Sequence, residues 1–255
     1  MALLELRAIS KDFPGLRALD GVSFDLEAGE VHALCGENGA GKSTLIKVLC
    51  GFHPHGSYGG EIVLDGAPLR LRTLRAAEAH GIALIAQELA LVPELSVAEN
   101  LVLGLGTDPR WARGARLDWS AARQRATELI EAFAIVAPGP DAPAGTLSGG
   151  NQQKLLLARA LEGQPAVLVM ENPTRGLDVR TTEEMHRRLR GAASAGVTVI
   201  VHSTDLDEVL ALADRVLVVH RKGVREAPRG ADRRVVGGMM LGVEPRQRST
   251  VDGQR

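Results

Sequence analysis

The first residues of the chain alternate between apolar and polar positions. Segments 4–9 and 22–26 place an apolar side chain at about every second residue. That period predicts strands with one buried face. The run 31–35 is apolar without interruption, which predicts a strand buried on both faces. The chain is therefore expected to open with strands of two kinds.

Strand and helix patterns alternate in the second half of the chain. Apolar runs at 167–170, 197–201 and 215–220 predict strands, and the patterns at 181–195 and 205–212 predict helices. This alternation favours a mostly parallel sheet with helices on its faces.

The middle of the chain, residues 96–161, has a mainly helical pattern with two breaks. Residues 107–118 predict a polar loop without internal order, and 137–143 predict a second loop by their Pro and Gly content. Either Asp118 or Ser120 can cap the helix after the first break. From residue 243 the chain is polar and aperiodic, and we expect a mobile tail.

Composition excludes some classes of function. Lys plus Arg number 30 and Asp plus Glu number 31, so the net charge of -1 argues against a nucleic-acid partner. Cys35 and Cys50 form no disulfide framework, which favours a reducing, cytoplasmic compartment. No apolar run approaches the ~20 residues that cross a bilayer, and the first residues lack a signal-peptide pattern. Any membrane-spanning part would come from another chain.

Residues 36–43, Gly-Glu-Asn-Gly-Ala-Gly-Lys-Ser, fit the phosphate-loop pattern G-x-x-x-x-G-K-[ST]. They follow a predicted strand and open a helix predicted over 42–49, so backbone N–H groups and the helix dipole can face phosphates. Lys42 is expected to reach the β- and γ-phosphates and the Ser43 hydroxyl to ligate Mg²⁺. The expected nucleotide-binding residues here are Gly36, Asn38, Gly39, Ala40, Gly41, Lys42, Ser43 and Thr44. The loop alone does not distinguish kinases, GTPases and motor ATPases.

Residues 147–154, Leu-Ser-Gly-Gly-Asn-Gln-Gln-Lys, narrow the family. They precede a helix predicted over 155–161, and small residues at a helix start expose N–H groups to an anion. Together with the phosphate loop they resemble the signature motif of ATP-binding cassette (ABC) proteins. The resemblance covers about residues 3–242. It implies an α/β fold: a P-loop NTPase cassette with a RecA-like core, an antiparallel β subdomain and a helical subdomain.

The resemblance also implies how the chain is organised. A single nucleotide-binding domain would span 1–242, with its core at 1–87 and 160–242 and its helical subdomain at 88–159, before a tail at 243–255. The signature residues Ser148, Gly149 and Gly150 would close over ATP held by a second cassette. Two subunits would then pair head to tail around two ATP molecules.

Three more positions match the family in order and spacing. Phe13 stands where the family places an aromatic ring against adenine, although a core Phe in the turn with Pro14 is the alternative. Gln87 matches the glutamine that senses Mg²⁺ and the attacking water. Asp178 matches the D-loop, which touches the partner subunit.

Finer matches indicate one branch of the family. Segments 11–19, 87–100 and 173–179 resemble sugar and nucleoside importer cassettes, and 54–58 looks most like xylose-type members. The resemblance implies an ATPase subunit at the cytoplasmic face of the inner (plasma) membrane. It would work with an integral membrane permease and, indirectly, with an external substrate-binding protein. A short permease helix would enter a groove between core and helical part, mainly against 88–103.

Importers of this branch usually carry two cassettes in one polypeptide, whereas this sequence holds one. Its front half resembles their first cassette, and its signature and later half resemble their second. Both a homodimer and a heterodimer therefore remain open.

The active-site residues depart from the family pattern after the strand 167–170. The pattern expects Asp-Glu, and the sequence has Glu171 and Asn172. Glu171 can still serve Mg²⁺, but an amide cannot accept a proton as a general base. The family's switch histidine aligns with Thr204, with His202 as the less favoured alternative on register grounds. The expected catalytic residues are Glu171, Asn172, Gln87 and Thr204, and the expected Mg²⁺ ligands are Ser43, Gln87 and Glu171.

Two functions follow from these residues. The first is a transport ATPase subunit. The second is a degenerate cassette that binds ATP as a regulatory or structural partner and hydrolyses it poorly. A soluble cassette protein of translation or DNA repair is disfavoured, since the sequence has no tandem cassette, zinc insertion or long coiled coil.

Overall fold

The computed structural model describes residues 2–88, 90–104, 110, 112–113 and 116–243. Six strands form the central sheet in the order β12-β11-β3-β10-β9-β6, and all but β12 run parallel. Their bounds are β3 Val31–Gly36, β6 Ile82–Ile85, β9 Val167–Glu171, β10 Thr198–His202, β11 Arg215–His220 and β12 Gly223–Glu226. The mostly parallel sheet expected from the sequence is confirmed, and β12 is an addition that the pattern did not predict.

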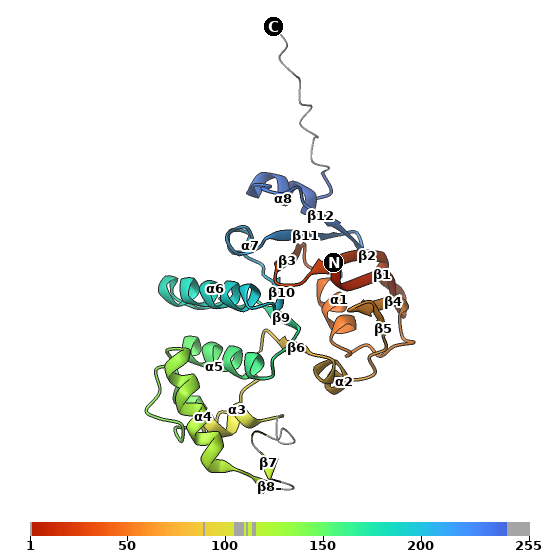
Figure 1. The fold of residues 1–255 in the computed structure, drawn as a ribbon. Helices are drawn as coiled ribbons and strands as arrows, with labels where there is room; N and C mark the ends of the chain where they lie inside the picture. The colour runs from red at the N-terminus through yellow and green to blue at the C-terminus, as the bar shows by residue number, and fades with distance from the viewer. Residues whose placement is uncertain (1, 89, 105–109, 111, 114–115, 244–255) are drawn as a thin grey trace.

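A second sheet of four antiparallel strands, in the order β2-β1-β4-β5, lies beside the first (Figure 1). Its strands are β1 Ala2–Phe13, β2 Leu16–Glu27, β4 Gly59–Leu64 and β5 Ala67–Leu69. Leu4, Leu6 and Ile9 are buried, as the alternation along β1 predicts.

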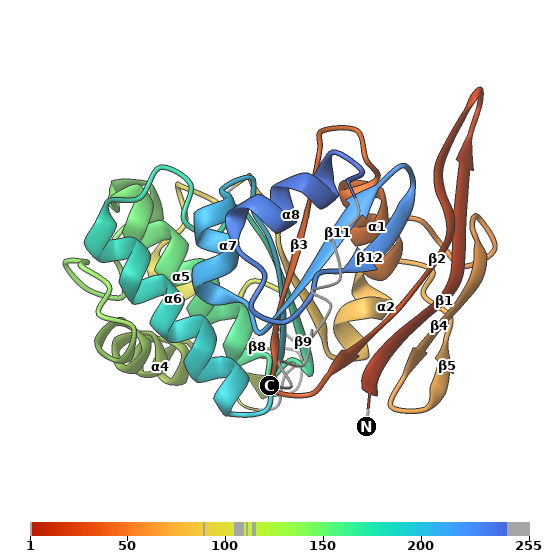
Figure 2. The same ribbon diagram turned by 90° about the horizontal axis from the view of Figure 1, so that it is seen from above.

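The central sheet separates two layers of the fold, because alternate residues of its strands face opposite ways. Val167 and Val169 of β9 join the cluster that includes α1 (Lys42–Leu49) and the antiparallel sheet. Leu168 and Met170 join the cluster of α5 (Gly149–Glu162) and α6 (Val179–Ser194) on the other face. The view from above shows α5 and α6 on one side of the sheet and α1 on the other (Figure 2).

The remaining helices are α2 Leu74–Ala79, α3 Val97–Val102, α4 Trp119–Ala132, the 3₁₀ helix η1 Ala144–Thr146, α7 Leu206–Leu212 and α8 Arg233–Met240. Each of them except η1 begins after a polar residue whose side chain caps its N-terminus. Asp118 caps α4 by accepting from Ala121 N at 3.1 Å, which decides between Asp118 and Ser120. None of the helices in the described segments is both long and apolar enough to cross a bilayer.

Two expectations about the middle of the chain need correction. Helix α5 starts at Gly149, well before the predicted 155, so the signature residues form its first turn. Short strands β7 (Ala112–Arg113) and β8 (Arg116–Leu117) pair within the segment expected to lack internal order. The tail expected from 243 lies outside the described residues from 244 onward.

A separate apolar cluster joins α3, α4 and α5. Leu155 and Ala158 face this cluster, while Leu156 and Leu157 on the same helix face the central sheet. Helix α5 thus packs against both this cluster and the central sheet. This packing fixes the position of the signature residues relative to the sheet and to α3 and α4.

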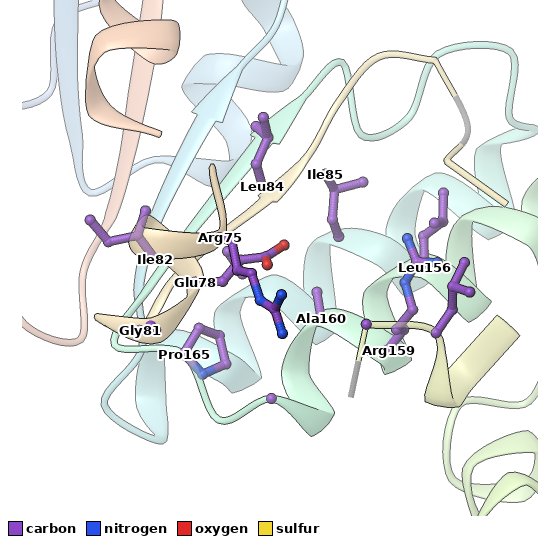
Figure 3. Close-up of a pocket in the computed structure, with 15 residues that line it drawn as sticks. Arg75, Glu78, Gly81, Ile82, Leu84, Ile85, Leu156, Arg159, Ala160 and Pro165 are labelled. Atoms are coloured by element: carbon purple, nitrogen blue, oxygen red, sulfur yellow. The ribbon is translucent and has the colours of Figure 1, made fainter. Parts of the chain in front are cut away.

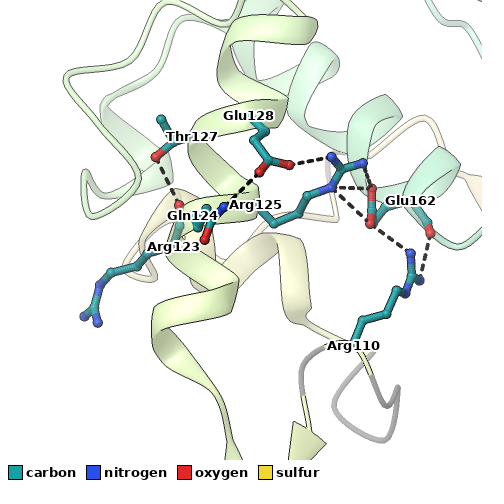
Figure 4. A network of polar contacts seen from close by, with 7 residues as sticks. All are labelled: Arg110, Arg123, Gln124, Arg125, Thr127, Glu128 and Glu162. Carbon is teal, nitrogen blue, oxygen red and sulfur yellow. Dashed lines mark hydrogen bonds and ion pairs between the residues drawn. The ribbon is translucent and has the colours of Figure 1, made fainter.

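An ion-pair network surrounds Glu162, the last residue of α5. The side chain of Glu162 is 6% exposed and lies 2.9 Å from both Arg110 and Arg125. Arg125 also contacts Glu128 at 2.7 Å (Figure 4). The hydrogen bonds that Arg125 donates to Glu162 and Glu128 raise the pKa of Arg125 above its usual value. The network ties α4 and Arg110 to the end of the signature helix.

Replacing Glu162 with glutamine should lower the free energy of unfolding by about 1–3 kcal/mol, because charge-assisted hydrogen bonds around a buried carboxylate are lost. The matched control is Glu128→Gln, since Glu128 is 48% exposed and exposed pairs contribute about 0–1 kcal/mol. Urea unfolding of both variants tests this. Equal losses of unfolding free energy in the two variants would show that burial of Glu162 adds nothing to the stability of the fold.

Candidate nucleotide site

The phosphate loop joins β3 to α1 and needs glycine at two positions. A Cβ on Gly36 would lie 2.3 Å from Val219 O, and one on Gly41 would lie 2.7 Å from Ala18 O. Gly41 also has a φ of 114°, a conformation that L side chains rarely adopt. The backbone can follow this path only without side chains at these two positions.

The loop presents unpaired backbone donors. Within the described part of the chain, nothing accepts a hydrogen bond from the N–H groups of Gly39, Gly41, Lys42, Ser43 or Thr44. They stand at the N-terminus of α1, where the helix dipole favours negative charge. Unpaired donors in that position form a cradle for an anion. The glycines and these donors therefore fit a phosphate group.

Lys42 lies inside this loop. Its Nζ donates to Gly36 O and to Glu37 O, both at 2.7 Å. Burial holds the pKa of Lys42 below its usual value. An ammonium has three donors, so one remains for a ligand next to the loop.

The side chain of Asn172 is hydrogen-bonded to two other predicted catalytic residues. Its Nδ2 donates to Gln87 Oε1 at 2.9 Å, and its Oδ1 accepts from Thr204 N at 3.2 Å. Asn172 is 7% exposed and has a φ of 49°, a left-handed conformation that Asn tolerates better than most residues. The side-chain amide of Asn172 therefore donates to Gln87 and accepts from Thr204.

Glu171 ends β9 on the face that Val167 and Val169 turn toward α1, since side chains alternate along a strand. It is half-buried, and its side chain makes no hydrogen bond or ion pair with another described residue. The exposed Ser43 hydroxyl at the start of α1 is also free of such partners. Mg²⁺ is commonly held by one or two protein oxygens together with phosphate oxygens, and these two groups fit that pattern.

His202 lies beside this group but has different contacts from Thr204. Its backbone oxygen accepts from Asn172 N at 2.6 Å, and its Nδ1 is buried without a partner in the described residues. Burial first, and then the charge of Lys42, lower the pKa of His202 to about 4. Thr204, and not the His202 ring, is the residue bonded to the Asn172 side chain.

Acid should destabilise the protein through His202. Its folded pKa of about 4 lies below the usual 6.5, so below pH 6.5 the unfolded chain takes up the proton first. The contribution of His202 to the free energy of unfolding is therefore fully present above pH 6.5, and it is lost as the pH falls towards 4. At pH 4.5 the loss is about 2–3 kcal/mol relative to a His202→Gln variant. Urea unfolding at pH 7.5 and 4.5 measures this, and parallel losses in both proteins would contradict it.

The signature and the D-loop lie next to each other. Ser148 precedes α5, and its Oγ accepts from Asn151 Nδ2 at 2.9 Å. A Cβ on Gly150 would lie 2.9 Å from Thr181 Cγ2, whereas one on Gly149 would meet nothing within 4 Å. Asp178 caps α6 by accepting from Thr181 N at 3.0 Å. Hydrogen bonds from Thr181 lower the pKa of Asp178.

The signature does not face the phosphate loop of its own chain. Helix α5 packs on α3, β6 and α6, while α1 packs on β2 and β3. The two helices contribute to clusters on opposite faces of the central sheet (Figures 1 and 2). One copy of the chain therefore brings together only part of the predicted residues.

Phe13 is at the end of β1 and is 37% exposed. Its ring meets the edge of His53 with centroids 5.5 Å apart, and Lys11 Nζ lies 5.1 Å from its centroid. This exposure excludes the alternative of a core Phe and leaves part of the ring open to a ligand.

Comparison with known proteins now identifies the family. The family model described as ABC transporter matches residues 19–175. This chain belongs to the ABC transporter family. The cassette is 43% identical over 220 residues to the xylose import ATP-binding protein XylG of Geobacillus kaustophilus, covering 85% of this chain and 42% of the relative. It is 39% identical over 217 residues to the L-arabinose transport ATP-binding protein AraG of Geobacillus stearothermophilus, covering 85% of this chain and 41% of that relative. The cassette thus spans less than half the length of these relatives.

Solved structures confirm the P-loop ABC cassette fold. The ADP conformation of MJ1267, an ATP-binding cassette of an ABC transporter, superposes with a TM-score of 0.78 at 26% identity, covering 94% of this chain and 95% of that one. The dimeric structure of MJ0796, a bacterial ABC transporter cassette, gives a TM-score of 0.74 at 25% identity, covering 90% of this chain and 99% of that one.

A cavity of about 320 Å³ opens on the cassette between α2, β6 and α5 (Figure 3). Among the described residues, the charged ones that line it are Arg75 and Glu78 from α2 and Arg159 from α5. Of the segment 88–103 expected to meet a permease, Leu103 is the described residue that lines it. Sequence reasoning missed Arg75, Glu78 and Arg159, because they belong to no motif and meet only in the folded chain.

Proposed function

We propose that this cassette is the ATP-binding subunit of an ABC importer for a sugar, driving transport by ATP-dependent pairing of cassettes. The observation that carries the proposal is the phosphate loop, with its unpaired donors and Lys42, in a chain of this family. The relatives named for xylose and L-arabinose support a pentose among sugars.

ATP would bind at the loop from Gly36 to Thr44, with Phe13 against the adenine ring. Ser43, Gln87 and Glu171 would hold Mg²⁺, which neutralises charge on the β- and γ-phosphates when it is bound. Lys42 would leave the carbonyls of Gly36 and Glu37 to meet the phosphates. Asn172 would keep Gln87 and Thr204 in place beside the γ-phosphate.

A second cassette would complete the site. Ser148, Gly149, Gly150 and Asp178 would act on ATP held by the partner, in a homodimer or a heterodimer. The opposite placement of α1 and α5 in one chain supports this arrangement, as does the dimeric relative.

The other partners follow from the importer proposal. The cassette would lie on the cytoplasmic face of the membrane against an integral membrane permease, and an external substrate-binding protein would supply the cargo. The nucleotide-binding domain would span 1–242, with a core at 1–87 and 160–242 and a helical subdomain at 88–159. The near-neutral charge still gives no reason to expect nucleic acid.

Asn172 favours a second candidate: a degenerate cassette that binds MgATP and hydrolyses it poorly. A side-chain amide cannot serve as the general base. In that case the cassette would regulate or complete a partner cassette through its intact signature.

Proteoliposomes containing the cassette, its partner cassette and the permease, with the substrate-binding protein added, test the importer proposal. ATP-driven uptake of labelled xylose or L-arabinose is expected with wild type and is expected to stop with Lys42→Ala. Uptake that is equal in the two preparations would contradict the proposal.

A further inference from the structure

One face of α5 lies against α6 and against the segment that leads to the D-loop. Gly150, Gln153 and Lys154 share this face, since residues three and four apart are neighbours on a helix. A Cβ on Gly150 would meet a side chain of α6 at 2.9 Å, and the buried Gln153 donates from Nε2 to Pro173 O at 3.2 Å. Lys154 Nζ lies 2.7 Å from Glu184 Oε2 on α6. The two helices that begin at the signature and at the D-loop are therefore in contact over their first two turns.

The carboxylate of Glu184 joins two cations in this contact. Besides contacting Lys154, it accepts hydrogen bonds of 2.6 Å and 3.2 Å from Arg188, one turn further along α6. The side chains of these three residues are at most 18% exposed. Charge-assisted hydrogen bonds shielded from water are stronger than those of exposed ion pairs, which contribute little. This ion-pair cluster is therefore suited to hold α5 and α6 in one relative position.

The same two cations also hold the end of α4. Lys154 Nζ donates to Ala134 O at 2.9 Å, and Arg188 donates to Ala132 O at 3.0 Å. The guanidinium of Arg188 also lies over the ring of Phe133, 4.7 Å from its centroid. The last carbonyls of a helix lack partners within the helix and favour positive charge. One ion-pair cluster therefore connects α4, α5 and α6.

We propose that Glu184 is a positioning residue for ATP-dependent pairing of cassettes. Through Lys154 it holds the signature at the start of α5 and the D-loop at the start of α6 in the relative position that a partner cassette requires. The inference rests on the proposed pairing and adds the residue that sets its geometry. Without the cluster, α5 and α6 would sample other relative positions, and the apparent affinity of pairing would fall in proportion to the fraction that remains competent.

Sedimentation of purified variants with MgATP tests the proposal. Glu184→Gln keeps the size of the side chain but removes its charge. It should weaken pairing by about 10-fold, which corresponds to a competent fraction of about one tenth. Its affinity for a fluorescent ATP analogue should stay unchanged, because α6 packs on the face of the central sheet opposite to α1.

Two other glutamates supply matched controls. Glu162→Gln removes a carboxylate that is also shielded from water, but Glu162 is bonded to Arg110 and to Arg125 of α4 rather than to α6. This variant should lose stability and still pair like wild type, which separates positioning from a general loss of stability. Glu183→Gln changes an exposed residue of α6 and should alter neither stability nor pairing.

Variants of Lys154 test the same contact from the other helix. Lys154→Met should weaken pairing as Glu184→Gln does, whereas Lys154→Arg keeps the charge and should retain most of the affinity. Pairing of Glu184→Gln as tight as that of Glu162→Gln, or equal losses in Lys154→Met and Lys154→Arg, would overturn this inference alone. Wild type that stays unpaired with MgATP, both alone and with the second cassette of its transporter, would overturn the proposed pairing with it.

Discussion

Changing Asn172 to glutamate should raise ATP turnover of the purified cassette by about 10²–10⁴-fold, the usual contribution of a positioned general base. Asn172 occupies a buried position between Gln87 and Thr204, so a carboxylate placed there would lie among the other predicted catalytic groups. Gln87 can turn its amide to donate to the new carboxylate, and Thr204 N already donates to this position. The left-handed backbone at residue 172 costs Glu more than Asn, by an amount on the order of 1 kcal/mol, which lowers stability without removing the base.

Asn172→Gln is the matched control for that change. It has the length of glutamate and the chemistry of the native amide, so it should leave turnover low. Steady-state phosphate release with MgATP compares the three proteins. A rise in Asn172→Gln as large as that in Asn172→Glu would mean that side-chain length, and not proton transfer, limits the native site.

Placing glutamate at Gly149 should weaken ATP-dependent pairing of cassettes by about 100-fold or more. A carboxylate about 4 Å from a partner's phosphate costs about 4 kcal/mol at the dielectric of a protein surface. The subunit itself should stay folded, because a Cβ on Gly149 meets nothing within 4 Å. A negative charge in the first turn of α5 also complements the helix dipole.

Gly191→Glu controls for the added charge. Gly191 lies on α6 and is exposed, and a Cβ there also meets nothing within 4 Å. Light scattering or sedimentation with and without MgATP measures pairing. If Gly149→Glu pairs as well as Gly191→Glu, the signature does not approach the nucleotide of a second cassette.

The sequence predicted best those features that depend on neighbours along the chain. Helix 42–49 and its loop were confirmed because glycine placement, strand and helix all fall within one short segment. Helix α5 was predicted to start too late, since 149–154 is Gly and polar residues and carries no apolar period. Helix α8 was missed for a similar reason: Gly237 and Gly238 stand inside it.

Long-range contacts could not be read from the pattern. Asn172 meets Gln87, which is 85 residues away in the sequence, and no local signal links the two. Arg159 reads as an ordinary helix residue until α2 and β6 close a cavity around it. Such positions depend on which segments the sheet order brings together, and periodicity does not specify that order.

The central claim is that this cassette holds MgATP in its own phosphate loop while Asn172 keeps hydrolysis slow. The most direct test measures ATP affinity and turnover on the same wild-type preparation, with Lys42→Ala as the blank. We predict saturable MgATP binding that Lys42→Ala removes, together with turnover no higher than that of the blank. Turnover well above the blank, in a preparation that contains no other cassette, would contradict the claim.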